Sequence, residues 1–257
     1  MLHRKNHLHR FVTVSQNMTI GHKPAHYMTF QTRRQREFER RERDILEAAL
    51  SLCATADFES VTVEQIAERA EVGKGTVYKH FGSKDELLFR LNVGFYEQLL
   101  VELRSNVHEG PPLQRLSNIV ERALRFHVLH REYRYVVEYC DRIDFMERAE
   151  PQWRDDFLRL DQAFQEWGVP IIQSGISAGV FGFRPADRTM LGIRACFQGA
   201  VTMLWAGDDW CPFGSDEETV ISAVTEFILS ALVSGADPPA TAQPGGLATA
   251  TARKVLS

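Results

Sequence analysis

Residues 62–81, with the sequence TVEQIAERAEVGKGTVYKHF, contain the side chains whose types and spacing point most clearly to a chemistry. Ile66 and Ala67 in the first half, and Val77 and Phe81 in the second, are spaced so that two short helices pack across a tight turn. The outward positions of the second half are small residues and hydrogen-bond donors, namely Gly73, Lys74, Gly75, Thr76, Tyr78, Lys79 and His80. Donors bind phosphate oxygens and base edges, and glycines let a backbone approach a phosphate closely. The segment therefore predicts a helix-turn-helix that contacts DNA.

Further cations flank this segment and are expected to contact the DNA backbone on either side of it. Lys84 follows the segment, and a run of arginines precedes it, comprising Arg33, Arg34, Arg36, Arg40 and Arg41. Glutamates interleave with that run at Glu37, Glu39 and Glu42, so half of the run also fits an ordinary salt-bridged helix face.

Hydrophobic periodicity places these side chains on helices. Thr62 with Gln65, and Ser83 with Glu86, have the spacing of capping boxes, and the Gly-Pro-Pro sequence at 110–112 ends a long helix. We expect a short helix after Thr62 and others at about 36–55, 74–80, 84–106, 113–129, 132–145, 151–178, 187–206 and 216–234, without strands. The predicted fold is all-α, with a three-helix N-terminal DNA-binding domain joined by a long helix to a C-terminal helical domain.

Charge and composition divide the chain into four regions. Residues 1–43 contain ten Lys or Arg and three acidic residues, and the rest contain 20 and 31, so a basic arm (+7) precedes an acidic body (−11). We expect a disordered basic extension at 1–32, a DNA-binding domain at 33–90, a helical effector-binding and dimerisation domain at 91–235, and a disordered tail at 236–257. Cysteines are few and widely spaced, and neither a membrane span nor a secretory signal is evident, so the sequence predicts a cytoplasmic protein.

Four linked submotifs resemble the N-terminal domain of TetR/AcrR-type transcriptional regulators. They are ILEAA at 45–49, VTVEQIA at 61–67, VGKGTVYKHF at 72–81 and SKDELL at 83–88. The resemblance covers about residues 36–90 and implies an all-helical homodimer that binds DNA through residues 62–81, with a variable C-terminal domain that usually binds a small effector. It places several side chains at positions that commonly contact phosphates, namely Thr62, Thr76, Tyr78, His80 and Lys84. By the same resemblance, Lys74 and Lys79 lie within reach of base edges or flanking phosphates.

Two positions depart from the pattern of that family. The family usually has Gly before the residue corresponding to Phe58 and at a turn position, where this chain has Asp57 and Glu71. A Glu in the left-handed backbone region costs about 1 kcal/mol, so we expect an altered or strained turn at Glu71.

Signatures of catalysis are missing from the sequence. It contains no P-loop, no G-x-G-x-x-G, no G-x-S-x-G and no H-E-x-x-H motif, so we expect neither catalytic residues nor a cofactor. His127 and His130, with Glu132, Glu138 and Cys140 downstream, are a hint of metal ligation, but core or surface roles are the favoured interpretation. We therefore expect no metal.

Aromatic residues are concentrated in the C-terminal body, where they either fill a core or surround an apolar pocket. The expected effector-binding residues are His127, Tyr133, Tyr139, Trp153, Phe157, Phe164, Trp167, Arg194 and Phe197. Arg194 interrupts an otherwise apolar helix, so it is either paired with a core carboxylate or faces a ligand. The expected effector is mostly apolar, and anionic if Arg194 faces it.

The last two helices have apolar stripes wider than one intrachain core needs, which predicts a two-fold homodimer. The expected interface residues are Leu191, Val201, Leu204, Val224, Phe227 and Ile228. Together these features predict a one-component repressor that binds operator DNA as a homodimer and is released by a small effector. The alternative is a ligand-independent DNA-binding regulator or DNA-organising protein whose C-terminal domain only dimerises.

Overall fold

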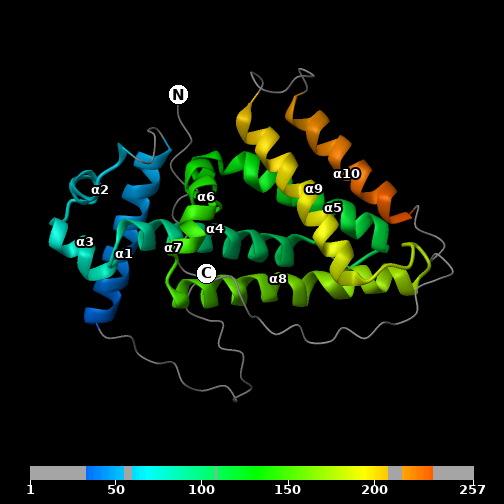
Figure 1. Cartoon of the computed structure of the whole chain (residues 1–257), viewed down its shortest axis with the longest axis horizontal. Helices are drawn as coiled ribbons and strands as arrows, with labels where there is room; N and C mark the ends of the chain where they lie inside the picture. Colours follow the sequence, from blue (N-terminus) through cyan, green and yellow to red (C-terminus); the bar gives the residue numbers. More distant parts are fainter. Residues whose placement is uncertain (1–32, 55–59, 108, 208–215, 234–257) are drawn as a thin grey trace, which may run out of the picture.

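The computed structural model of the chain describes residues 33–54, 60–107, 109–207 and 216–233, and within these ranges it contains helices and no strand (Figure 1). The α-helices are α1 (Arg33–Cys53), α2 (Val63–Arg69), α3 (Lys74–His80), α4 (Lys84–Asn106), α5 (Pro112–Leu129), α6 (Arg134–Cys140), α7 (Ile143–Arg148), α8 (Pro151–Ser177), α9 (Ala186–Ala206) and α10 (Glu217–Val233). A short 3-10 helix, η3 (Arg131–Tyr133), precedes α6. The all-α prediction is confirmed. The expected disordered ends, and Asp57, Phe58 and Cys211, lie outside the described residues.

Helices α1, α2 and α3 form a head at one end of the molecule, shown at the left of Figure 1. Both expected N-caps are present, because Thr62 accepts a hydrogen bond from the Gln65 amide and Ser83 accepts one from the Glu86 amide. The capping box is complete at Thr62, whose own amide donates to the Gln65 side chain over 2.7 Å. At α4 the box is altered, because the Glu86 carboxylate accepts from the Gly82 amide, also over 2.7 Å.

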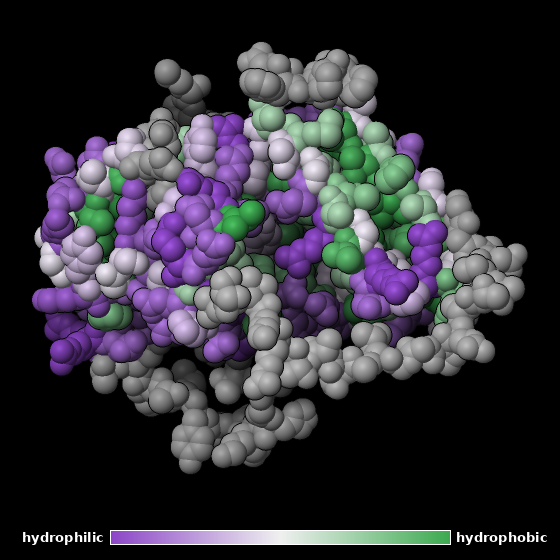
Figure 2. Space-filling model, in the orientation of Figure 1, coloured by the Kyte–Doolittle hydropathy of each residue, from purple (hydrophilic) through white to green (hydrophobic). Residues whose placement is uncertain are grey.

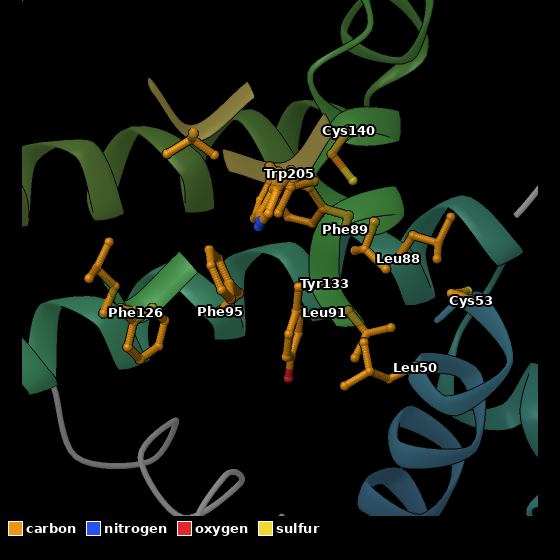
Figure 3. Close-up of a cluster of buried hydrophobic side chains, with 14 of the residues drawn as sticks. Leu50, Cys53, Leu88, Phe89, Leu91, Phe95, Phe126, Tyr133, Cys140 and Trp205 are labelled. Carbon is orange, nitrogen blue, oxygen red and sulfur yellow. The ribbon is translucent and has the colours of Figure 1, made fainter. Parts of the chain in front are cut away.

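Helix α4 joins the head to the body and begins and ends where its caps predict. It packs against α5, α6 and α8 as well as α1. Figure 3 shows side chains from α1, α4 and α6 in one apolar cluster, including Leu50, Cys53, Leu88, Leu91 and Cys140. One core is therefore continuous from the head into the body.

The body contains the remaining helices, with α10 against α5 and α9, and α8 against α4 and α9. One expected helix, 132–145, is instead divided into η3, α6 and α7. Cys140 and Phe145 are both buried. In a continuous helix, five residues at about 100° each would separate these side chains by about 140°, so the break at Asp141 and Arg142 lets both face the core. Among the described residues, no helix is long and apolar enough to cross a membrane.

Candidate nucleic-acid interface

The α2–turn–α3 unit is held by its apolar inner face. Val63, Ile66, Ala67 and Val77 are buried, and so is Phe81 at the end of α3. The turn between the helices contains Glu71 with φ 54°, the left-handed conformation that favours glycine. The left-handed backbone expected at Glu71 is therefore present, and the strain that it implies stays a prediction.

The outer face of the same unit presents the predicted donors at one surface. Thr62, Lys74, Gly75, Tyr78 and Lys79 are exposed, and Thr76, His80 and Lys84 are half-buried. Tyr78, a large aromatic ring that ends in a hydroxyl group, is 48% exposed. The predicted residues of 62–81 thus lie in the head, and Lys84 begins α4 directly after it.

Lys74, the first residue of α3, forms an ion pair with Glu64 of α2. Its ammonium also lies 5.9 Å from the centroid of the Tyr78 ring. Hydrogen bonding to Glu64 raises the pKa of Lys74, and the same contact lowers the pKa of Glu64, so both are charged at neutral pH. Glu64 was not among the predicted site residues. Its position in the first turn of α2, two residues after Thr62, is the signal that could have placed it near the DNA-binding face.

His80 stacks on Phe38 of α1, with ring centroids 4.0 Å apart. Burial lowers the pKa of His80, so the imidazole is neutral at pH 7 and adds no charge to the surface. Its buried Nδ1 has no hydrogen-bond partner among the residues that the structure describes. Phe38 is 43% exposed although it is a large apolar residue, because it lies over the His80 ring and not in the core.

The arginine run divides into two parts along α1. Arg40 and Arg41 both bind the Glu37 carboxylate, at 2.6 and 3.2 Å, which confirms a salt-bridged face for this half of the run. Arg33, Arg34 and Arg36 in the first turn of α1 are exposed. The two halves of the run therefore differ, because the later arginines bind a carboxylate of their own helix and the first-turn arginines are exposed to solvent.

A cavity of about 150 Å³ lies in the body between α4, α5, α8 and α9. All of its lining residues are apolar: Leu99, Leu103, Leu116, Ile119, Val120, Ala123, Phe164, Trp167, Gly168, Ile171, Ile172, Met190, Ile193 and Phe197. Three of the expected effector-binding residues, Phe164, Trp167 and Phe197, are among them. The aliphatic lining residues of all four helices were missed, because aliphatic residues at helical spacing have the same pattern in a solid core.

The other six expected effector residues do not line this cavity. His127 and Tyr133 are core residues against the Phe95 ring, both with ring centroids at 5.0 Å. Burial lowers the pKa of His127 to about 4, and its Nδ1 lies 2.7 Å from the Ala123 carbonyl oxygen. Trp153 stacks on Phe89 with centroids 5.5 Å apart, and Phe157 packs half-buried against the core.

Tyr139 and Arg194 both bind carboxylates and do not line the cavity, which for Arg194 is the first of the two alternatives that the sequence left open, although the pair lies at the surface and not in the core. Tyr139 donates to Asp85 over 2.8 Å, and Arg194 donates to Asp161 over 2.8 Å. The Arg194 side chain is 61% exposed, so the helix face that seemed apolar in sequence turns this residue to the solvent. Neither side chain can orient a ligand in the cavity.

The predicted interface residues of α9 and α10 fall on two faces. Leu191 and Phe227 are 68% and 64% exposed, and Val224 is half-buried. The inclusion of Val201, Leu204 and Ile228 needs correction, because all three are buried inside the protomer, where α9 and α10 pack on each other and on α5.

No group of three or more potential metal ligands occurs in the described part of the chain. The two histidines considered as metal ligands have different environments, since His127 is in the core and His130 contacts Glu132 at 3.3 Å. Cys53 and Cys140 are buried thiols whose pKa is raised by burial, to about 11 for Cys53.

The sequence profile described as "Bacterial regulatory proteins, tetR family" matches residues 45–91, which span the end of α1, the helix-turn-helix and the start of α4. The chain is also 30% identical over 141 residues to the HTH-type transcriptional repressor KstR2 of Mycobacterium tuberculosis, a match that covers 54% of this chain and 68% of KstR2. The chain belongs to the tetR family of bacterial regulatory proteins. It is thus a DNA-binding transcriptional regulator and not an enzyme.

Two further comparisons cover a larger share of this tetR-family regulator. The uncharacterized HTH-type transcriptional regulator YhgD of Bacillus subtilis is 30% identical over 152 residues, or 57% of this chain and 74% of YhgD. The crystal structure of the transcriptional regulator FadR of Bacillus subtilis in complex with stearoyl-CoA has a TM-score of 0.60 at 17% identity, covering 74% of this chain and 98% of FadR. That structural similarity establishes the fold of the body.

Proposed function

We propose that this regulator is a homodimeric repressor that binds operator DNA through the outer face of α2 and α3 and is released by a small apolar effector. The observation that supports this most directly is the donor face of the helix-turn-helix, exposed at one end of the molecule over a buried inner face. A helix-turn-helix reads DNA by laying its second helix in the major groove. KstR2, to which the chain is similar, is named a transcriptional repressor.

The roles that we propose follow from where each side chain lies. Lys79, Lys84 and Arg34 neutralise DNA phosphates. The hydroxyl groups of Thr62, Thr76 and Tyr78 form hydrogen bonds with the sugar-phosphate backbone of the DNA. Lys74 reaches a base edge or a flanking phosphate, Gly75 allows close approach of the DNA, and the neutral His80 contributes a donor without charge.

The dimer is proposed to form through the outward faces of α9 and α10. In Figure 2 hydrophobic residues gather over these helices at the upper right, whereas the head at the left is mostly hydrophilic. Many exposed residues of these helices are apolar or small, including Leu191, Gly192, Ala195, Gly199, Met203, Ala223 and Phe227, and the exposed polar residues Arg194, Gln198 and Glu226 lie among them. Two helices from each of two subunits would bury this face in an isologous four-helix contact.

The cavity is the proposed effector site, and its lining selects the effector. Among the described residues no charged side chain lines it, and the indole N–H of Trp167 is the only N–H or O–H donor among the lining side chains. A buried polar group without a partner is costly, so the group that it binds is uncharged and mostly apolar. Cavities of about 150 Å³ bind ligands of the size of benzene, whereas drug-sized ligands need about 300 Å³ or more. The group is therefore a single ring or a short hydrocarbon segment. FadR, with the same fold, was solved with stearoyl-CoA, whose acyl chain is also apolar.

Footprinting of the DNA flanking the gene, with and without effector candidates, tests the proposal. We expect one protected site with two-fold symmetry, and release of the DNA by an uncharged apolar compound that also raises the Tm of the protein. Ala123→Leu, which fills the cavity, should abolish release but not protection, whereas Ala178→Leu at the exposed end of α8 should change neither. Protection that no apolar compound relieves, without a thermal shift, would favour the ligand-independent alternative.

A further inference from the structure

The helix-turn-helix has no net positive charge, which is unusual for a surface that binds a polyanion. Residues 62–81 contain three acidic side chains and three basic ones, listed as Glu64, Glu68, Glu71, Arg69, Lys74 and Lys79. One of the three cations, Lys74, is bound to one of the three carboxylates, Glu64. The electrostatic attraction of this surface for DNA is therefore weakened by the segment itself.

The Glu64–Lys74 ion pair lies on the donor face and not beneath it. The side chains of Glu64 and Lys74 are 59% and 51% exposed, and the Lys74 ammonium also lies 5.9 Å from the centroid of the exposed Tyr78 ring. A phosphate that reaches Lys74 thus approaches a carboxylate at the same point.

A structural role explains this pair poorly. The two helices are already joined by the buried side chains of Ile66, Ala67 and Val77. Ion pairs between exposed side chains contribute little to stability, because both ions are well hydrated when they are apart. The pair has a larger effect on the binding of an anionic ligand than on folding, because Glu64 competes with that ligand for the Lys74 ammonium.

We propose that Glu64 is an autoinhibitory residue of the DNA interface, which binds the Lys74 ammonium in the free protein and so lowers the affinity for phosphate backbone of any sequence. The inference rests on the proposed interface and adds Glu64 to it. DNA must replace the carboxylate before Lys74 can neutralise a phosphate. Binding by backbone contacts alone is thereby weakened, which limits occupancy of the many non-operator sites of a genome.

Glu64→Gln tests the proposal, because it removes the charge and keeps the size of the side chain. Binding of the full-length chain to a labelled DNA duplex of arbitrary sequence is measured by fluorescence anisotropy over a range of salt concentrations. We expect Glu64→Gln to lower the Kd by roughly two- to fivefold at moderate salt. Because Lys74 then releases a counterion from a phosphate, the slope of log K against log salt should steepen by up to about 0.9.

Two comparisons isolate the pair from a general change in charge. Glu68→Gln makes the same charge change one turn further along α2, at a side chain without an ion-pair partner among the described residues, and should give a smaller gain. In a Lys74→Met background the gain from Glu64→Gln should disappear. An unchanged or weaker affinity of folded Glu64→Gln, an equal gain from Glu68→Gln, or a gain that persists in Lys74→Met would each overturn the proposal.

The experiment also separates this inference from the interface on which it rests. Lys79→Ala and Lys84→Ala test the DNA face without altering the Glu64–Lys74 pair. If both weaken binding and Glu64→Gln has no effect, only the autoinhibitory role is overturned. If neither weakens binding, the interface itself is overturned, and the role of Glu64 with it.

Discussion

The Tyr139 hydroxyl, in the body, donates a hydrogen bond of 2.8 Å to the carboxylate of Asp85 in the first turn of α4. Arg148 of α7 completes the contact, since it binds the same carboxylate at 3.5 Å and the Tyr139 oxygen at 3.1 Å. Asp85 directly follows Lys84, one of the proposed DNA contacts. This polar cluster therefore joins the base of the head to α6 and α7.

Loss of the Tyr139–Asp85 hydrogen bond should loosen the head relative to the body. We expect Tyr139→Phe to lower the free energy of unfolding by about 1 kcal/mol and to reduce the effect of an effector on DNA affinity. Tyr135→Phe, on the same helix but with its hydroxyl bound to Arg134, is the matched control. Equal effector responses in the wild type and Tyr139→Phe would show that the cluster takes no part in coupling.

Glu71 should be a site where a single substitution stabilises the chain. Its φ of 54° strains any residue with a Cβ, so Glu71→Gly should raise the free energy of unfolding by about 1 kcal/mol in urea. Glu68→Gly, inside α2, should lower it by a similar amount because glycine disfavours a helix. A destabilised Glu71→Gly variant would show that the turn conformation carries no strain.

The buried His127 predicts a loss of stability in acid. Its pKa falls from 6.5 to about 4 on folding, so between these values the unfolded chain binds more protons and stability decreases as the pH falls. We expect the wild type to lose about 2 kcal/mol more than His127→Gln between pH 7 and pH 5, measured by urea unfolding. Identical pH dependences of the two proteins would contradict the burial of a neutral imidazole.

Phe227 should be required for the dimer. Phe227→Asp places a charge in the centre of the proposed α9–α10 contact and should yield a monomer by light scattering at micromolar concentration. Leu158→Asp on α8 is matched, because the exposed fractions of the two side chains are 62% for Leu158 and 64% for Phe227. A wild-type monomer, or a dimeric Phe227→Asp, would place the interface elsewhere.

Local signals in the sequence were enough to predict the helices of the head. The caps at Thr62 and Ser83 and the apolar spacing around Ile66 and Val77 act over a few residues, so they determine α2, α3 and the start of α4 without help from the rest of the chain. The left-handed turn at Glu71 was predictable only through the family resemblance, since no local signal marks it.

Distant contacts determine the parts that could not be predicted. Asp85 and Tyr139 are 54 residues apart, and Arg194 and Asp161 are 33 apart, so periodicity within one helix does not indicate that either pair meets. The division of the expected 132–145 helix follows from two side chains, Cys140 and Phe145, that both face one core. Helices α9 and α10 both pack on α5, and this contact determines which of their apolar residues are buried and which are exposed. The apolar stripes alone do not show which side of each helix faces α5.

The salt dependence of DNA binding tests most directly whether the outer face of α2, α3 and the start of α4 is the DNA interface. Lys84→Ala and Lys79→Ala should each weaken binding and reduce the magnitude of the slope of log K against log salt by about 0.9, the value for one lost phosphate contact. Arg104→Ala, near the far end of α4, should leave the slope unchanged. Wild-type affinity and slope in folded Lys84→Ala and Lys79→Ala would contradict the account.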